Sequence, residues 1–560
     1  MDEADILIIG GGSAGCVLAA RLSENPGLRV RLIEAGRDTP PGAIPDDIAD
    51  VFPRAYANPA YFWPDLKAVG RAGSPARPFT QARILGGGST VMGLWAVRGL
   101  PEDYDNWAAN GAKGWSYEDV LPFFRKLERD LDIASPEHGG DGPVAIRRIP
   151  SAEWPGFNRA LAKAASEHGL PLRPDLNARD IGGVFAMPTS TDGERRVSAA
   201  SAYLSPEVRR RANLDIVTEA AAQVILFEGR RAVGAIVARP GGSVQTIKVR
   251  KVVVSAGAIH SPALLLKSGI GPANRLTELG VPVVADSPQV GANLQNHLFV
   301  HLGAVVRRGA RQSPLQRIYA MAAARISSGF AGAPRGDLFA TFIARTSGYA
   351  TGNRLGIVGA SLYAPFSRGR VSLDPARSDG PPAVDFNLLS DPRDAARLLH
   401  AAQLARSLLS DDDVRRVTHE SFILPPNPPI RLLNRPGLSS LLLGWAIAAT
   451  VGLGPAARKA ALRTALKPGK LLADIRDERE FEELVLAGAT PMFHPVGTCA
   501  LGRVVDGEAR VKGVENLRVV DASIMPTIPR GNTNIPTLMI AEKCAAHIGS
   551  SLGMQALSLA

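Results

Sequence analysis

The chain has 560 residues, a formal net charge of +11 at pH 7, and 45% hydrophobic and 21% charged residues. This length exceeds the usual size of one hydrophobic core, so two domains are expected, and the composition excludes disordered and fibrous proteins. The three cysteines (Cys16, Cys499 and Cys544) lack any CxxC spacing, so we expect no disulfide framework and no metal site.

The positive charge is concentrated in two segments that contain no acidic residue. Residues 287–336 hold six arginines and residues 421–473 hold seven arginines and lysines, so these segments account for the whole positive excess. Neither interleaves aromatic residues with its basic ones, and no nucleic-acid motif is present. Nucleic acid is therefore not an expected partner.

The first 36 residues have the pattern of a nucleotide-binding unit. Residues 5–9 predict a buried parallel strand, residues 10–15 match G-x-G-x-x-G, residues 16–22 predict a helix, and residues 29–33 predict a strand that ends at Glu34. A lone G-x-G-x-x-G also occurs in ordinary turns. Here all parts follow in the expected order and spacing, which predicts a dinucleotide site.

Each glycine of this turn has its own role. Gly10 permits the tight turn, Gly12 lets the backbone approach a pyrophosphate, and Gly15 lets helix and strand pack closely. The helix N-terminus offers free N–H groups and its positive dipole end to phosphate. Glu34 is placed to accept hydrogen bonds from ribose hydroxyls, and its charge disfavours NADP. The turn alone does not distinguish FAD from NAD.

A second glycine-rich turn lies further along the chain. Residues 86–90 (GGGST) precede an apolar stretch that predicts a helix carrying Trp95, and their backbone suits a flat or anionic ligand. Two such turns suit a long, extended cofactor. Residues 103–129 and 154–168 predict helices, and residues 213–254 alternate as a β-meander that returns to the nucleotide-binding unit.

The C-terminal part is informative again. His494 stands in the stretch MFHPVGTC (492–499), and residues 517–520 predict a strand. A helix is expected over residues 536–549, with proline in its first turn. Its positive end is then aimed at residues 532–534.

Together these stretches resemble the glucose–methanol–choline (GMC) family of FAD-dependent alcohol oxidoreductases. The nucleotide turn, GGGST, GAIHSPALLLKSGIG (257–271), HPVGTC and DASIMPTIPRGNTNIPTLMIAEK (521–543) follow in family order over nearly the whole chain. Residues 257–271 fit the family's second signature at every defined position. The chain looks most like bacterial hydroxymethylfurfural and aryl-alcohol oxidases, and choline dehydrogenases are a more distant likeness. The resemblance implies FAD as the cofactor.

The resemblance also implies the fold. We expect an α/β (α+β overall) architecture, with a Rossmann-like FAD-binding domain and a substrate-binding domain built on an antiparallel sheet flanked by helices. The FAD-binding domain would comprise residues 1–155, 205–300 and 495–560, and the substrate-binding domain residues 156–204 and 301–494, with 421–473 as a lid or surface segment.

The expected FAD contacts come from the head, the middle and the tail of the chain. They are Gly10, Gly12, Ser13, Ala14, Gly15, Glu34, Ala35, Leu85, Gly87, Ser89, Met92, Val224, Asp521, Ala522, Asn532 and Thr533. The helix behind residues 532–534 would stabilise the negative charge that hydride transfer leaves on the flavin. Some family members attach FAD covalently through a histidine near GGGST, but no histidine lies between residues 5 and 109, so non-covalent FAD is expected.

Alcohol oxidation needs a base for the hydroxyl proton and an acceptor for the hydride, which the flavin supplies. His494 is the base candidate, because neutral imidazole accepts a proton near pH 7 and the family places its catalytic histidine in this stretch. The family pairs this base with a histidine or asparagine close to the last helix. Asn534 matches that place and would hold the alkoxide geometry. The alternative role for Asn534 is that of a turn residue that caps the last helix.

Trp95, Met492 and Phe493 suggest an apolar, partly aromatic pocket. The resemblance then implies oxidation of a primary aryl or furan alcohol to the aldehyde, and on to the acid, with O2 as acceptor. Met92 stands where the family usually has asparagine, and methionine donates no hydrogen bond, so a choline-like or aliphatic alcohol dehydrogenase that passes electrons to quinone stays open. A flavin-containing cyanohydrin lyase that uses the same histidine is disfavoured.

Residues 436–457 carry no charge, and their length nominally permits a membrane span. Glycines and Pro455 interrupt the run, so a buried helix or a lid is favoured. The alternative is peripheral docking of residues 421–473 on anionic lipid. The acidic N-terminus leads directly into the first strand, so no signal peptide is expected and a cytoplasmic setting is favoured.

Overall fold

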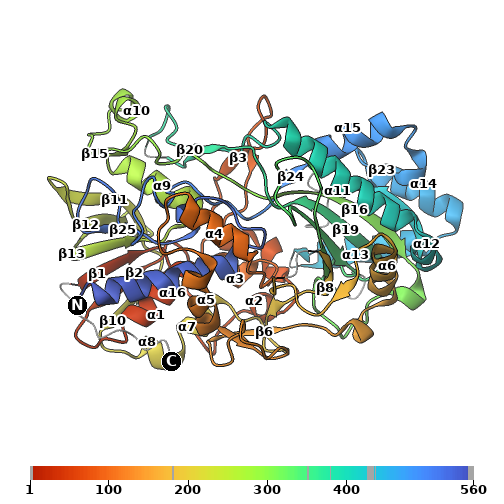
Figure 1. Cartoon of the computed structure of the whole chain (residues 1–560), viewed down its shortest axis with the longest axis horizontal. Helices are drawn as coiled ribbons and strands as arrows, with labels where there is room; N and C mark the ends of the chain where they lie inside the picture. The colour runs from red at the N-terminus through yellow and green to blue at the C-terminus, as the bar shows by residue number, and fades with distance from the viewer. Residues whose placement is uncertain are drawn as a thin grey trace.

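The computed structural model describes residues 4–179, 182–349, 352–378, 380–425, 434–435 and 437–552. Two large sheets organise the chain, one at each end of an elongated molecule (Figure 1). The two-sheet architecture expected from the sequence is confirmed. The domain boundaries stay a prediction.

The first sheet has seven strands in the order β10–β2–β1–β13–β12–β11, with β25 beside β13. They are β1 (Ala4–Ile9), β2 (Val30–Ile33), β10 (Leu214–Val217), β11 (Ala221–Glu228), β12 (Arg231–Ala238), β13 (Val244–Val254) and β25 (Leu517–Val519). Strands β10, β2, β1, β13 and β25 run parallel, and β11, β12 and β13 pair antiparallel. The predicted meander and the predicted strand–helix–strand unit are both confirmed, with α1 (Ser13–Leu22) between β1 and β2.

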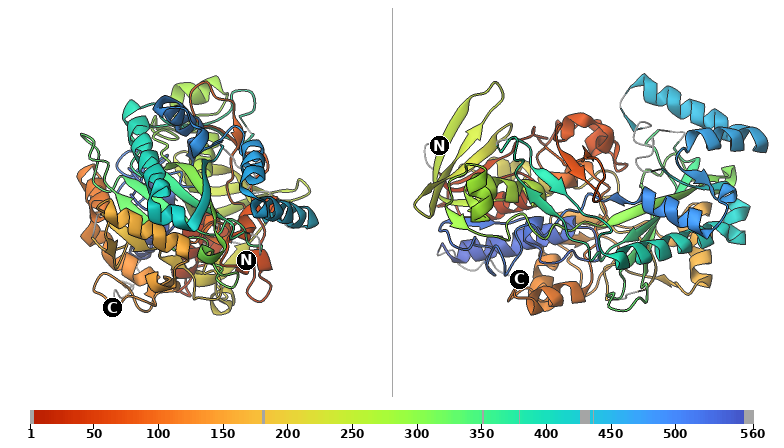
Figure 2. Two further views of the ribbon diagram at one scale, coloured as in Figure 1. Left: turned by 90° about the vertical axis from the view of Figure 1, so that its right-hand side faces the viewer. Right: turned by 90° about the horizontal axis from the view of Figure 1, so that it is seen from above.

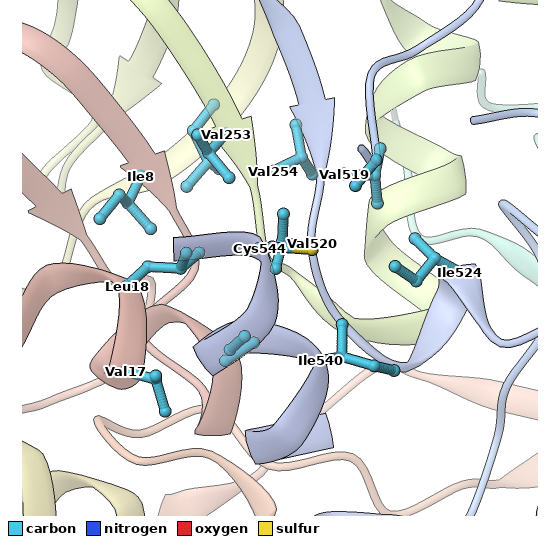
Figure 3. Packing of buried hydrophobic residues seen from close by; sticks show 14 of the residues in the cluster. Ile8, Val17, Leu18, Val253, Val254, Val519, Val520, Ile524, Ile540 and Cys544 are labelled. Carbon is cyan, nitrogen blue, oxygen red and sulfur yellow. The ribbon is translucent and has the colours of Figure 1, made fainter. Parts of the chain in front are cut away.

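Helices α1 and α16 (Asn534–Ser550) pack against each other and against this sheet. Both are largely buried, because each carries apolar residues around most of its surface. Figure 3 shows side chains of both helices meeting those of the strands in one core. The labelled residues are Ile8, Val17, Leu18, Val253, Val254, Val519, Val520, Ile524, Ile540 and Cys544. The head and the tail of the chain thus share one core.

The second sheet has nine strands in the order β23–β22–β16–β19–β18–β17–β8–β7, with β24 beside β16. They are β7 (Leu172–Arg173), β8 (Gly183–Ala186), β16 (Leu298–Val306), β17 (Ala322–Ile326), β18 (Leu338–Ile343), β19 (Leu355–Leu362), β22 (Thr418–Ile423), β23 (Lys470–Leu471) and β24 (Thr490–Pro491). All pairs are antiparallel except β7 with β8. The flanking helices are α6 (Gly156–Glu167), α11 (Pro392–Ser410), α12 (Asp412–Val417) and α15 (Glu478–Gly488).

The remaining elements connect or cover the two sheets. The helices are α2 (Asp46–Ala49), α3 (Gly88–Val91), α4 (Pro101–Ala109), α5 (Tyr117–Leu127), α7 (Ala199–Tyr203), α8 (Pro206–Arg209), α9 (Gly257–Lys267), α10 (Ala273–Glu278), α13 (Leu438–Gly452) and α14 (Pro455–Ala465). Small sheets join β20 (Arg370–Ser372), β21 (Ala383–Asp385), β3 (Lys67–Val69) and β4 (Arg77–Pro78), then β5 (Glu128–Asp130), β6 (Val144–Arg147) and β9 (Thr189–Ser190), and lastly β14 (Ile270–Gly271) and β15 (Ala285–Asp286).

Two predicted helices have other boundaries than expected. Helix α16 begins at Asn534, two residues before Pro536. Helix α3 ends at Val91, so the helix predicted to carry Trp95 is wrong. At Met92 the backbone becomes extended, and Leu94 has a φ of +70°, which ends the helix. Nη1 of Arg196 donates to the carbonyls of Ser89 (3.2 Å) and Met92 (2.6 Å) and holds the chain in this course.

In the described part of the chain, only some of the basic residues in the two basic segments are exposed. In the first, Arg325 is buried and Arg317 forms an ion pair with Asp50. In the second, Arg458 is buried against Glu420. Among the described residues, no helix has the length and apolar character that crossing a membrane requires. Residues 426–433 and 436 of the second segment lie outside the described residues.

Candidate active site

A cavity of about 1130 Å³ extends from the first sheet to the second. Its lining contains most of the predicted site residues: Gly10, Gly12, Ser13, Ala14, Glu34, Ala35, Gly87, Ser89, Met92, Trp95, Met492, Phe493, His494, Asp521, Ala522, Asn532, Thr533 and Asn534. Gly15, Leu85 and Val224 lie outside the lining. Next to Val224, residues 220–223 line the cavity instead, and a bulge between Ala222 and Val224 interrupts the strand there.

The first glycine turn forms one wall of the cavity. Gly10 has a φ of +105°, and a Cβ on Gly15 would stand 1.9 Å from the carbonyl oxygen of Gly10. Neither position therefore accepts a side chain. A Cβ on Gly12 would meet nothing closer than the carbonyl oxygen of Ser255 at 4.0 Å, so this backbone borders open space. The N-terminus of α1 faces the same space, as a phosphate group requires.

The second glycine turn lies directly against the first. The N–H of Gly86 donates to the carbonyl of Gly11 (2.7 Å), and a Cβ on Gly87 would stand 2.9 Å from Cα of Gly12. Both turns thus form one cradle with backbone on both sides. Such a cradle fits a long dinucleotide better than a mononucleotide.

Glu34 is buried where the strand β2 ends. Its two carboxylate oxygens accept hydrogen bonds from the N–H groups of Gly11 (2.8 Å) and Gly36 (2.7 Å). Burial raises the pKa of Glu34, and these hydrogen bonds oppose that shift. Because each carboxylate oxygen accepts more than one hydrogen bond, Glu34 retains capacity for ribose hydroxyls.

The expected position of Asn534 beside His494 is wrong, because Asn532 occupies it. Nδ2 of Asn532 lies 3.0 Å from Nε2 of His494. Asn534 instead accepts a hydrogen bond from the hydroxyl of Ser13 (2.7 Å), which ties the N-terminus of α16 to that of α1. Asn534 starts the helix, and its side chain is directed to the nucleotide cradle.

His494 belongs to a chain of four polar groups. Its Nδ1 lies 2.9 Å from Nδ1 of His297, and Nε2 of His297 lies 3.1 Å from the carbonyl oxygen of Pro529. At the other end, the hydroxyl of Tyr363 donates to Oδ1 of Asn532 (3.4 Å). The ring of Tyr363 also stacks on His297 at 4.1 Å.

The partners at the two ends assign the protons in this chain. A carboxamide nitrogen only donates, so Nε2 of His494 accepts and its proton sits on Nδ1. A carbonyl only accepts, so the proton of His297 sits on Nε2 and its Nδ1 accepts from His494. Every hydrogen bond therefore has one donor and one acceptor. His494 is left with an unprotonated Nε2 at the cavity.

Burial keeps both histidines neutral. Desolvation lowers the pKa of His494 to about 4. It also lowers the pKa of His297 well below the ordinary value, and the neighbouring His494 lowers it further. At neutral pH the imidazole of His494 is thus free to accept a proton.

Sequence reasoning missed His297. This residue precedes β16 and lies 197 positions from its partner His494. The neighbouring Asn296 accepts from the N–H of His494 (3.2 Å) and donates to the carbonyl of Met492 (2.6 Å), which holds the two segments together. The only available signal was a histidine among amides in NLQNH, at the start of a predicted apolar run.

Several aromatic rings line the cavity. Phe493 contacts Tyr56 (ring centroids 5.2 Å apart) and Phe79 (6.3 Å). Trp95, which also lines the cavity, stacks on Tyr319 with ring centroids 6.1 Å apart. Nε1 of Trp95 is buried without a hydrogen-bond partner in the described structure. The cavity thus combines flat apolar walls with an unused donor.

One further histidine faces the cavity from the large sheet. His301 of β16 lines it beside Phe299, whose ring centroid lies 4.4 Å away. A Cβ on Gly359 would stand 2.5 Å from the hydroxyl of Thr341 and 3.5 Å from Nε2 of His301, so this glycine leaves room for both side chains. Burial lowers the pKa of His301 to about 4. No residue in the described ranges forms a hydrogen bond with its ring.

One buried group of acids and histidine has metal-ligand composition. His138 lies 2.9 Å from carboxylate oxygens of Glu128, Asp130 and Asp175. Arg98 and Arg148 form ion pairs with the same carboxylates. Burial alone would lower the pKa of His138, but the hydrogen bonds to the acids raise it to about 10. Each of the three carboxylates is thus paired with His138 and with an arginine, so we interpret the group as a structural ion network.

A nucleotide cradle and a buried neutral imidazole in one cavity define an oxidoreductase that removes hydrogen from its substrate with a bound dinucleotide. Residues 4–299 and 365–541 match the GMC oxidoreductase family, and the chain belongs to it. Its members are flavin-dependent enzymes that act on CH–OH donors, and FAD is the expected cofactor.

The chain is 39% identical to 5-(hydroxymethyl)furfural oxidase of Methylovorus sp. (strain MP688), over 97% of this chain and 98% of that protein. It is 33% identical to an oxygen-dependent choline dehydrogenase of Burkholderia thailandensis, over 98% and 94%. Among solved structures, pyridoxine 4-oxidase from Mesorbium loti matches with a TM-score of 0.79 at 28% identity, over 98% and 99% of the two chains. A fungal aryl-alcohol oxidase with a TM-score of 0.75 and 21% identity, over 99% and 100%, shares the fold alone.

Proposed function

We propose that this protein oxidises a primary alcohol on a furan or aryl ring to the aldehyde, with O2 as the final acceptor. The observation on which the proposal rests is the position of His494, which is buried at the cavity with Nε2 3.0 Å from Nδ2 of Asn532. The relative that is 39% identical is a 5-(hydroxymethyl)furfural oxidase, which supports both the substrate class and the acceptor.

FAD, when bound in the cradle, supplies the acceptor for the carbon-bound hydride. The residues that would hold it are the two glycine turns, Glu34 and the N-termini of α1 and α16. The cavity lining near residues 86–93 offers no histidine or cysteine to bond it covalently, which supports non-covalent binding.

His494 takes the hydroxyl proton at Nε2. The amide of Asn532, which is 3.0 Å from that nitrogen, is then free to donate to the alcohol oxygen. The imidazolium that forms keeps its proton on Nδ1 and donates it in the hydrogen bond to Nδ1 of His297. Tyr363 and Pro529 hold the ends of the chain, so the base keeps its orientation while its charge changes.

The walls of the cavity favour a neutral, flat alcohol over choline. Glu34 and Asp521 are the acidic residues among the described residues that line it. Glu34 accepts from two backbone N–H groups, and Asp521 accepts from the N–H of Gly257 and Ser523. Both carboxylates belong to residues expected to contact FAD, so we assign them to the cofactor and not to a quaternary ammonium.

The purified yellow protein is expected to bleach when furan or benzyl alcohols are added without oxygen, because the flavin is then reduced. Absorbance near the flavin maximum measures this step for a panel of primary alcohols that includes choline. Colour that returns when air is admitted supports the oxidase. Colour that stays lost in air, but returns with a quinone, supports the dehydrogenase alternative. A cyanohydrin lyase would bleach with no alcohol, and that result contradicts the proposal.

His301 is proposed to bind a polar group at the far end of the substrate ring. The variant His301→Leu should raise KM for 5-(hydroxymethyl)furfural roughly tenfold, the loss expected for one neutral hydrogen bond. Furfuryl alcohol has no second polar substituent, so its KM should stay unchanged. The exposed His419 provides the control variant His419→Leu. Equal increases for both alcohols would contradict this role.

A further inference from the structure

The helical hairpin (residues 438–465, α13 and α14) is an apolar surface that the proposed reaction does not use. In Figure 2, right, these light-blue helices stand out from the end of the molecule away from the N-terminus. Twelve large hydrophobic residues are exposed in the described chain, and half of them lie in this hairpin. They are Leu438, Leu441, Leu442, Leu443, Trp445 and Leu453.

Among the described residues, the inner face of the hairpin packs against the rest of the protein. Gly444, Ala448 and Val451 of α13 are buried, and the carbonyl of Ala448 accepts from Nη1 of Arg354 (3.2 Å). Arg458 of α14 forms a buried ion pair with Glu420. The expected burial of this segment therefore holds for one face. The other face of the hairpin is exposed to solvent, with Leu438 79% and Trp445 62% exposed.

The length of α13 decides how it can meet a membrane. Fifteen residues rise about 22 Å as a helix, which is shorter than the roughly 30 Å hydrocarbon core of a bilayer. An apolar helix of this length fits the interface plane, with leucine and tryptophan side chains at the acyl boundary. It does not fit a crossing.

The charges near the apolar face indicate which kind of partner it binds. Arg435, Lys459 and Lys467 are exposed, and residues 421–473 contain no acid. A basic rim around an apolar face complements a membrane with anionic lipid. In a two-fold contact with a second copy, the basic rims of the two copies would face each other. Their like charges would repel, which disfavours a second copy as the partner of this face.

We propose that the outer face of the hairpin docks on an anionic lipid surface. Leu424, Pro425 and Asn434, which flank the base of the hairpin in sequence, line the active-site cavity. Docking would therefore set this side of the cavity close to the lipid headgroups. This inference is independent of the substrate proposed above.

The test uses the FAD-loaded full chain and sedimentation with vesicles of phosphatidylcholine containing about 30% phosphatidylglycerol. The bound fraction should be high at about 50 mM salt and fall at about 500 mM, because salt screens the basic rim. Vesicles of phosphatidylcholine alone should bind less protein. No sedimentation with anionic vesicles at either salt concentration overturns the proposal.

Variants separate the apolar and basic contributions. Leu442→Glu/Trp445→Glu should lower the bound fraction at least tenfold, and Lys459→Glu/Lys467→Glu should remove its salt dependence. Leu315 is 92% exposed and lies in a loop outside the hairpin. Leu315→Glu is therefore the matched control and should bind vesicles as the wild type does. Flavin absorbance and alcohol oxidation in detergent-free buffer check that each variant is folded.

Binding that survives Leu442→Glu/Trp445→Glu overturns the assignment to this face. So does a concentration-dependent dimer of the wild type, seen by analytical ultracentrifugation, that becomes a monomer in this variant while neither protein binds vesicles. That result would identify the face as a contact between two copies.

Discussion

Replacement of His494 by alanine is expected to slow reduction of the flavin by alcohol by about 10²–10⁴-fold, the usual contribution of a general base. Without the imidazole, the one unprotonated nitrogen in the Tyr363–Asn532–His297 remainder is Nδ1 of His297, which does not line the cavity. Anaerobic stopped-flow absorbance measures the reduction rate directly. His419→Ala is the matched control, since this histidine is exposed on β22.

The pH profile provides a second test of the same base. A histidine loses its basic function as pH falls through its pKa, because the imidazole is then already protonated. Burial lowers the pKa of His494 to about 4. The protonation of this residue should therefore leave the reduction rate constant from about pH 5 to pH 8, and the rate should fall only below about pH 5. A break in the wild-type profile near 6.5 would mean that the base is not buried in the resting enzyme. A wild-type rate in His494→Ala would remove this residue from the mechanism.

The two asparagines near the start of α16 could not be distinguished from the sequence. Asn532 and Asn534 are two positions apart, at the place where the backbone turns into a helix, so their side chains diverge. Family resemblance located the segment, but only the fold shows that Asn532 meets His494 and Asn534 meets Ser13. His297 was missed for a related reason: its pairing with His494 depends on contacts between segments nearly two hundred residues apart, and periodicity carries no information about them.

The nucleotide-binding half was far more predictable than the substrate half. In residues 4–36 the backbone requirements are local, since Gly10 needs a positive φ and Gly15 needs a missing Cβ. The course of the chain around Trp95 and Val224 depends instead on a distant arginine and on a strand bulge. The exposed face of α13 was expected only under the alternative of peripheral docking, because a uniformly apolar run gives no sign of which side is covered.

Substitution of Gly15 by valine is expected to abolish FAD binding. A Cβ at this position would stand 1.9 Å from the carbonyl oxygen of Gly10, and backbone cannot move aside as a side chain can. The N-terminus of α1 must then shift away from β1, and its hydrogen bond from Ser13 to Asn534 breaks with it. Overpacking of this kind costs about 1–3 kcal/mol, and the loss of phosphate-binding N–H geometry adds to it, so affinity should fall by at least about a hundredfold.

Titration of flavin-free protein with FAD, followed by quenching of flavin fluorescence, measures this affinity. Gly140 lies exposed in a loop with no atom within 4 Å of an added Cβ, so Gly140→Ala should bind FAD as the wild type does. Thermal unfolding of the flavin-free proteins separates lost binding from lost folding: a Gly15→Val protein that unfolds cooperatively but stays colourless supports the cradle. Heating the yellow wild type should leave its flavin in the supernatant, because the described residues that line the cavity at the two glycine turns include no histidine or cysteine to bond it covalently. Yellow Gly15→Val protein with wild-type affinity would mean that the dinucleotide does not lie on this turn.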